Sequence, residues 1–184
     1  MVINKKIVFT CQNDICEYRT ILPGDVTKNY ISGLKNQNSY LVNNPSDINM
    51  EKQKDYVLKK NLSNNDTICG LFINSVLIGT AGLQNITGNG NTTIGIFVFS
   101  SNIRGKGFGK TLVWASCLIA SYIFNKTIFE AGMEKDNIPS VKSFLSCGFK
   151  IISEDEKYHR VQLYLKNLKK PTFINNVKIV NIKV

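Results

Sequence analysis

Residues 107–124 form an almost uncharged apolar segment that strongly restricts the folds open to this chain. Lys110 is the only charged residue in it. A helix that is apolar on all its sides must be buried, so we expect this segment to be a helix packed against a sheet. Residues 92–99, which precede it, form a nearly continuous apolar run, typical of a strand buried on both faces. Together the two segments predict a strand–loop–helix unit at the centre of one domain.

The rest of the chain predicts a mixed α/β domain without an internal repeat or a linker. Short β-rich runs bounded by polar turns indicate strands, and apolar residues at helical spacing indicate helices. The expected strands are residues 5–10, 15–22, 67–73, 76–84, 92–99, 126–133, 149–152 and 160–165, with a further strand-like run at 177–184. The expected helices are one capped by Asp25, one from Pro45 to about Asn61, and those at 107–124 and 137–146.

The charge of the chain is uneven. Lys and Arg outnumber Asp and Glu by 23 to 13, a net charge of +10. Residues 157–184 hold seven of the basic residues and no acidic one, so this end carries +7 and the preceding 156 residues only +3. A basic excess does not define a fold, but it favours anionic partners such as phosphates, nucleic acids or acidic membrane surfaces.

Composition also excludes several classes of protein. The longest uncharged apolar run, residues 111–124, is shorter than the roughly 20 residues of a membrane-spanning helix. The N-terminus lacks the apolar core and cleavage site of a signal peptide, so we expect a cytoplasmic protein. The five scattered cysteines and the single histidine, His159, do not have zinc-ligand spacing. We therefore expect reduced thiols and no metal.

The loop between the apolar strand and the apolar helix is rich in glycine and in positive charge. Gly105, Gly107 and Gly109 let the backbone approach a ligand closely, and the free N–H groups of the following helix end favour an anion. The P-loop pattern fails because Arg104 occupies the position of its first glycine. The dinucleotide pattern Gly-x-Gly-x-x-Gly also fails, since its last glycine falls one residue too early. The loop is thus a phosphate-binding turn of another type.

Residues 104–109 fit the pattern Arg/Gln-x-x-Gly-x-Gly/Ala, and in this the sequence resembles the GNAT superfamily of acyl-CoA N-acyltransferases. A second motif of that superfamily follows at the right spacing, as Asn137, Ser140, Phe144, Gly148 and Phe149. The resemblance covers about residues 15–168. Residues 18–27 are similar to the start of the ribosomal-protein-acetyltransferase-like branch, and residues 130–149 are similar to branches that act on amino sugars of surface glycans as well as on protein N-termini.

The resemblance implies a GNAT fold, with a central, mostly antiparallel twisted sheet of about seven strands that splays in the middle and is flanked by about four helices. It also implies a domain division. Residues 1–14 would be an N-terminal strand or extension, and residues 15–168 the acetyltransferase domain. Residues 169–184 would be a basic C-terminal extension, packed on the domain or swapped with a second copy.

The resemblance further implies acetyl-CoA as co-substrate and direct transfer of its acetyl group to an amine. The backbone around Phe97, Val98 and Phe99 would hold the pantetheine arm, and one N–H would polarise the thioester carbonyl. The pyrophosphate would lie on Arg104, Gly105, Lys106, Gly107, Phe108, Gly109 and Lys110. The opposite wall of the arm would come from Asn137, Ser140 and Phe144.

The catalytic residues are less clearly marked. Many GNAT enzymes have a proton-donating Tyr where this chain has Phe144, so we take Ser140 as the hydroxyl that protonates or hydrogen-bonds the leaving sulfur. Glu134, at the exit of the preceding strand, is our candidate for the base that removes the proton of the amine. Tyr158, His159 and a water relay without a dedicated base remain alternatives.

The acceptor is left open by the sequence. The resemblance favours an amino sugar, including a nucleotide-linked one, or a protein N-terminus, and the charge of +10 makes a cationic polyamine a third choice. A different alternative is a catalytically impaired acyl-CoA-binding module whose basic tail binds an anionic partner. A nucleic acid partner is not excluded by the charge. The run at residues 177–184 could add to a sheet edge within the chain or across a homodimer.

Overall fold

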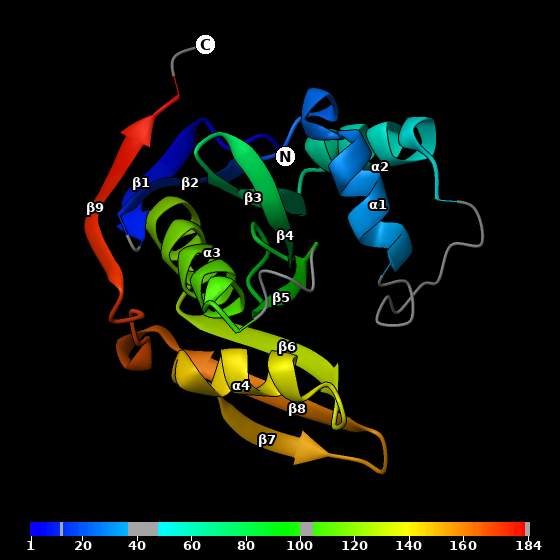
Figure 1. Ribbon diagram of the computed structural model, residues 1–184. Helices are drawn as coiled ribbons and strands as arrows, with labels where there is room; N and C mark the ends of the chain where they lie inside the picture. The colour runs from blue at the N-terminus through cyan, green and yellow to red at the C-terminus, as the bar shows by residue number, and fades with distance from the viewer. Residues whose placement is uncertain (12, 37–47, 100–104, 183–184) are drawn as a thin grey trace.

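The computed structural model describes residues 1–11, 13–36, 48–99, 105–182. In these residues, nine strands form one sheet that is flanked by four α-helices (Figure 1). The strands are β1 (Lys5–Cys11), β2 (Asp14–Thr20), β3 (Thr67–Ile73), β4 (Val76–Gln84), β5 (Thr92–Val98), β6 (Ile128–Glu134), β7 (Lys150–Glu154), β8 (Tyr158–Tyr164) and β9 (Ile174–Asn181). The helices are α1 (Lys28–Asn36), α2 (Met50–Leu62), α3 (Phe108–Phe124) and α4 (Ile138–Ser146), with short 3₁₀ turns η1 (Pro23–Asp25) and η4 (Leu165–Asn167).

The sheet has the strand order β7-β8-β6-β5-β4-β3-β2-β1-β9, and every neighbouring pair except β5 and β6 is antiparallel. The predicted mixed α/β class is therefore confirmed. The strand count is nine rather than about seven, because the terminal segments β1 and β9 extend one edge of the sheet. Parallel pairing of β5 with β6 is limited in the described chain to Thr92 with Phe129 and Thr93 with Glu130, so the two strands splay beyond these pairs.

Helices cover both faces of the sheet. Figure 1 shows α3 on one side of the central strands and α1 with α2 on the other. Strand β3 supplies side chains to both layers: Leu71 belongs to the core under α3, while Ile68 and Phe72 belong to the core under α1 and α2. Alternation of side chains along a strand explains this division. The apolar helix α3 is buried as its sequence predicts.

Two helix starts differ from the sequence prediction. Asp25 does not cap α1, because it lies in the η1 turn and its carboxylate accepts the backbone N–H of Leu22 at 2.8 Å. The Thr27 hydroxyl accepts the N–H of Tyr30 at 3.3 Å instead, at the start of α1. The start predicted for the second helix, residues 45–47, lies outside the described residues. In the described part, α2 begins at Met50 and is capped by Asn49.

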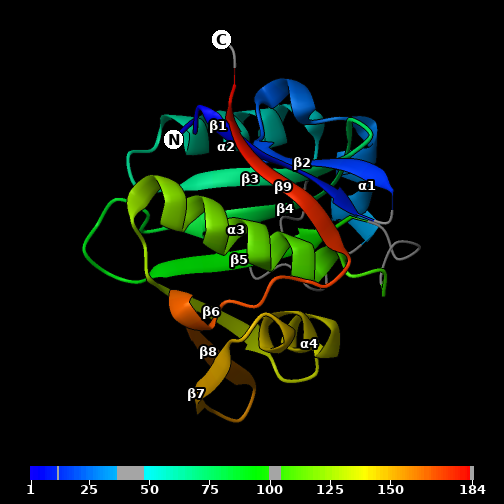
Figure 2. The ribbon, with the colours of Figure 1, turned by 90° about the vertical axis from the view of Figure 1, so that its left-hand side faces the viewer.

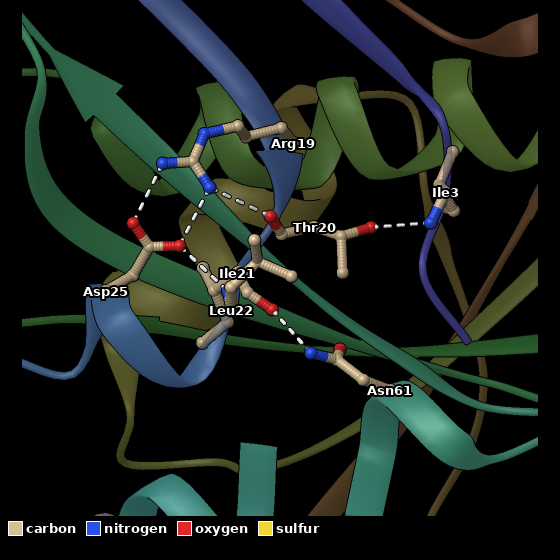
Figure 3. A network of polar contacts seen from close by, with 7 residues as sticks. All are labelled: Ile3, Arg19, Thr20, Ile21, Leu22, Asp25 and Asn61. Carbon is tan, nitrogen blue, oxygen red and sulfur yellow. Dashed lines mark hydrogen bonds and ion pairs between the residues drawn. The ribbon is translucent and has the colours of Figure 1, made fainter. Parts of the chain in front are cut away.

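A polar network fixes the chain where it leaves β2 and enters the helical layer (Figure 3). The guanidinium of Arg19 forms two bonds of 2.8 Å to the carboxylate of Asp25 and lies 3.9 Å from the ring centroid of Phe72. The amide of Asn61 donates to the carbonyl of Ile21 at 3.1 Å, which ties α2 to the same turn. This turn therefore sets the direction in which the chain enters α1.

We expect Arg19→Lys to lower the free energy of unfolding by about 1–2 kcal/mol, since lysine cannot reproduce the forked ion pair or the stacking on Phe72. Urea unfolding followed by circular dichroism measures this. Lys6→Ala is the control, because it removes an ion pair with Glu17 that has a single bond and is more exposed than the Arg19–Asp25 pair. We expect this change to lower the free energy of unfolding by less than about 1 kcal/mol. Equal stability of Arg19→Lys and the unchanged protein would contradict this role of Arg19.

The C-terminal segment crosses from one end of the sheet to the other. After β8 and η4 it runs below α3, reaches the N-terminal end of that helix and turns into β9 (Figure 2). Strand β9 pairs antiparallel with β1, with Ile7 opposite Ile179. Val177 and Ile179 pack against the core under α3. In the described residues, no helix combines the length and the apolarity that crossing a membrane requires.

Candidate functional site

A pocket of about 680 Å³ lies where the N-terminus of α3 faces β5 and α4. This volume is within the usual range for small-molecule and cofactor sites, roughly 300–1,000 Å³. Its described walls come from β5, the loop before α3, the first turns of α3 and α4, and one residue of the C-terminal segment. The lining residues are Ile96, Phe97, Val98, Gly105, Lys106, Gly107, Phe108, Gly109, Lys110, Asn137, Ile138, Pro139, Ser140, Lys142, Ser143 and Phe173.

The end of the pocket at α3 is suited to an anion. Gly107 is the N-cap of α3, has φ of +89° and brings no side-chain cap, so the first N–H groups of the helix stay available to a ligand. Lys106, Lys110 and Lys142 also line the pocket, and none of the three is ion-paired with a described residue. No described acidic residue lines it. The helix dipole and the three lysines thus both favour a negatively charged ligand at this end of the pocket.

The splay of β5 and β6 creates a second binding feature. Residues 95–98 pair with β4 on one side, but the described part of β6 pairs with β5 only at its beginning. Among the described residues, the other backbone edge of β5 at Phe97 and Val98 has no strand partner, so it can bind an extended polar ligand as a further strand would bind it. The pocket combines this edge with the cationic end in one continuous space.

The first turns of α4 form the opposite wall. The Asn137 side chain caps the helix by accepting the N–H of Ser140 at 3.3 Å. The Ser140 hydroxyl has only a weak described contact, 3.8 Å to the sulfur of Met133, so its proton is available to a bound ligand. Gly109 eases the close approach of α4 to α3, since a Cβ there would lie 2.6 Å from the Ser143 hydroxyl oxygen and would displace it.

The structure brings together most residues that the sequence predicts for this site, but not all. Phe99 and Phe144 do not line the pocket. Phe99 follows β5 and packs edge-on against Tyr30 in the core under α1 and α2. Phe144 is 2% exposed and packs against Phe149, because its position on α4 faces the core. Arg104 lies outside the described residues.

Glu134 lies at the end of β6, outside the pocket lining, and is already paired. Its carboxylate is 2.9 Å from the ammonium of Lys157 and accepts the Tyr158 hydroxyl at 3.4 Å. Lys157 holds the pKa of Glu134 below its ordinary value, so the carboxylate is ionised at neutral pH but is a weakened base. His159 also lies away from the pocket lining, with its Nδ1 3.1 Å from the Glu154 carboxylate.

Several lining residues were missed by the sequence analysis. Ile138, Pro139, Lys142 and Ser143 lie in the same α4 turns as Asn137 and Ser140, so their helical spacing is a signal that finds them. Phe173 has no such signal, since it belongs to a segment outside both motifs. Phe173 comes to line the pocket because of the path that the chain takes from β8 to β9.

The family of the chain follows from comparison with known proteins. The model of the acetyltransferase (GNAT) family matches residues 36–149, more than half of the chain and including both motifs. The chain belongs to the acetyltransferase (GNAT) family. The predicted family, the N-acetyltransferase activity and acetyl-CoA as co-substrate are thereby confirmed. No curated protein matches the sequence.

Several solved structures share the fold of this chain at low sequence identity. Spermidine N-acetyltransferase from Vibrio cholerae, in complex with CoA and spermine, is 18% identical with a TM-score of 0.70, covering 83% of this chain and 96% of its own. RimJ from Mycobacterium smegmatis, in complex with CoA-disulfide, is 12% identical with a TM-score of 0.71 and 90% coverage of both chains. YncA from Salmonella typhimurium, a putative acetyltransferase with acetyl-CoA, is 17% identical with a TM-score of 0.64, covering 84% and 96%. At these identities the likeness establishes the GNAT fold alone.

The pocket fits an acyl-CoA in its chemistry. One end offers helix N–H groups and lysines, which suit a pyrophosphate, and the other offers a free strand edge, which suits the amide groups of a pantetheine arm. Among the described residues, no group of three or more His, Cys, Asp or Glu is placed to hold a metal ion.

Proposed function

We propose that this protein transfers an acetyl group from acetyl-CoA directly to the primary amine of an amino sugar, free or nucleotide-linked, or of a protein N-terminus. The observation that carries the proposal is the continuity of the pocket, which joins the cationic N-terminus of α3 to the free edge of β5. The first feature suits the phosphates of CoA and the second suits its arm, so the thioester would lie where the strands splay.

The chain's own residues would divide the binding between them. Gly105, Lys106, Gly107, Phe108, Gly109 and Lys110 would hold the pyrophosphate through backbone N–H groups and lysine charge. Phe97 and Val98 would offer backbone groups to the pantetheine arm, with one N–H polarising the thioester carbonyl. Asn137 and Ser140 would line the other side of the arm.

Bound acetyl-CoA supplies the acetyl group as a thioester. A C–N bond forms to the acceptor amine and the C–S bond breaks. Ser140 would donate its proton to the departing sulfur and regain one from solvent, or would donate only a hydrogen bond to it, and its weak contact with Met133 leaves it available for either role. The amine proton would pass to Glu134 or through water to solvent. Because Lys157 weakens Glu134 as a base, we favour the relay to solvent, with Glu134 as a fixed anion at its end.

The choice of acceptor rests on charge. The chain carries a net charge of +10, which disfavours the approach of a cationic polyamine. The three lysines of the described pocket lining do not add to this, because they are assigned to the phosphates of CoA. A nucleotide-linked amino sugar is anionic, and a protein N-terminus beside RNA lies in an anionic setting. Both acceptors suit this surface better than spermidine does, although a spermidine N-acetyltransferase is among the proteins of similar fold.

The proposal is tested by thiol release from acetyl-CoA in the presence of one acceptor class at a time: UDP-linked amino sugars, peptides with free N-termini, and spermidine. Mass spectrometry of the acceptor detects the added acetyl group. We expect turnover with an amino sugar or a peptide, at least about tenfold faster per unit concentration than with spermidine.

Two outcomes overturn parts of this proposal. Faster turnover with spermidine would overturn the acceptor assignment and leave the acetyl-CoA site standing. Saturable binding of acetyl-CoA without turnover on any of the three classes would favour the binding-module alternative over this acceptor assignment.

A further inference from the structure

The C-terminal segment 168–174, which brings Phe173 to the pocket, is fixed to the domain near both of its ends. The backbone N–H of Lys169 donates to the carbonyl of Cys147, at the end of α4, at 3.0 Å. Ile174 donates to the carbonyl of Pro171 at 3.1 Å, and its side chain is fully buried at the start of β9. Because both ends of the segment are anchored, Phe173 between them has a fixed backbone position.

Phe173 lies directly against the phosphate-binding turn. A Cβ added to Gly107 would lie 2.5 Å from Cζ of the Phe173 ring and 2.7 Å from its Cε1, so the ring lies in contact with this glycine and any side chain there would displace it. Phe173 is also part of the pocket lining. Ser140 and Val98, the residues proposed for the thioester, come from other walls. The ring therefore marks the end of the pocket at the N-terminus of α3.

We propose that Phe173 forms an aromatic wall for the nucleotide end of acyl-CoA, so that the segment outside the family motifs completes the co-substrate site. This inference rests on the proposed acetyl-CoA site. Phosphates held at the Gly105–Lys110 turn bring the adenosine of CoA next to the turn, where the ring contacts Gly107. An adenine has a π-face that stacks on an aromatic side chain, which gives the ring a specific partner. Lys106, Lys110 and Lys142 supply charge to the same pocket.

Calorimetric titration of Phe173→Ala with acetyl-CoA and with 3′-phospho-ADP, the nucleotide half of CoA, tests this wall. We expect the affinity for both ligands to fall by about tenfold or more, since stacking on a base is lost in both cases. The loss should appear in the KM for acetyl-CoA more than in the turnover number at saturation, because the ring is assigned to the nucleotide and not to the thioester. Phe173→Tyr, which keeps the ring, should bind both ligands within about threefold of the unchanged protein.

Two further variants separate stacking from packing. Phe173→Leu fills the space without a π-face and should also bind 3′-phospho-ADP at least about fivefold more weakly. Val177→Ala is the matched control: it loosens the adjoining strand β9 against the same core but lies outside the described pocket lining, and its affinities for both ligands should not change. Thermal unfolding shows whether each variant is folded.

The outcomes distinguish this inference from the proposed function. In one outcome the unchanged protein binds acetyl-CoA, and the folded variants Phe173→Leu and Phe173→Ala bind 3′-phospho-ADP with the affinity of the unchanged protein. This outcome refutes the aromatic wall but leaves the co-substrate site standing. Tighter binding by Phe173→Ala also refutes it, because the ring would then obstruct the site. If the unchanged protein binds neither ligand, the proposed site itself fails.

Discussion

Gly107→Glu is expected to weaken acetyl-CoA binding by about a hundredfold or more. Gly107 has φ of +89°, a conformation that strains any other residue by roughly 1–3 kcal/mol. A Cβ there would also collide with the ring of Phe173. The added carboxylate would place negative charge at the helix end that we assign to the pyrophosphate. Isothermal titration with acetyl-CoA measures the loss directly.

A matched glycine is available as the control for this change. Gly82 lies in β4, where an added Cβ meets no atom within 4 Å, so Gly82→Ala should bind acetyl-CoA like the unchanged protein. Thermal unfolding of both variants checks that each is folded. A folded Gly107→Glu variant with the affinity of the unchanged protein would refute the assignment of the pyrophosphate to this turn.

Ser140→Ala is expected to lower the turnover number by about a hundredfold and to change the KM for acetyl-CoA by less than about threefold. General acid catalysis contributes roughly that factor, and Ser140 is the hydroxyl in the described lining that we assign to the leaving sulfur. The helix should remain capped, because Asn137 bonds to the backbone of Ser140 and not to its hydroxyl. Steady-state kinetics at saturating acceptor separates the two parameters.

Ser146→Ala serves as the control for Ser140. Ser146 lies in the last turn of the same helix, donates to the carbonyl of Ser143 and is not part of the described lining, so its loss should leave both parameters unchanged. A Ser140→Ala enzyme with an unaltered turnover number would instead indicate that solvent protonates the thiolate.

The sequence predicts the centre of this fold well for physical reasons. A helix at residues 107–124 with a single charged residue has no stable place except against a sheet, and the glycine turn before it follows from backbone geometry. Local signals also explain why Asn137 caps α4, since an Asn before an apolar helical run is a strong capping signal. These features depend on residues close together in the chain.

The remaining features depend on contacts between distant segments. Asp25 looks like a helix cap in sequence, but the forked pair with Arg19 holds it in a turn before α1. The helical spacing of residues 137–146 puts Phe144 on the apolar face with Val141, whereas the family motif assigns it to the pantetheine arm, and the structure buries it in the core. Phe173 reaches the pocket only because β9 pairs with β1, at the far end of the chain. No local pattern carries such information.

A crystal structure of the protein with CoA tests the central claim most directly. We expect the pyrophosphate at the N-terminus of α3 on residues 105–110, the arm between the splayed β5 and β6, and the thiol beside Ser140. CoA bound elsewhere on the molecule, with the pocket between α3, β5 and α4 empty, would contradict it.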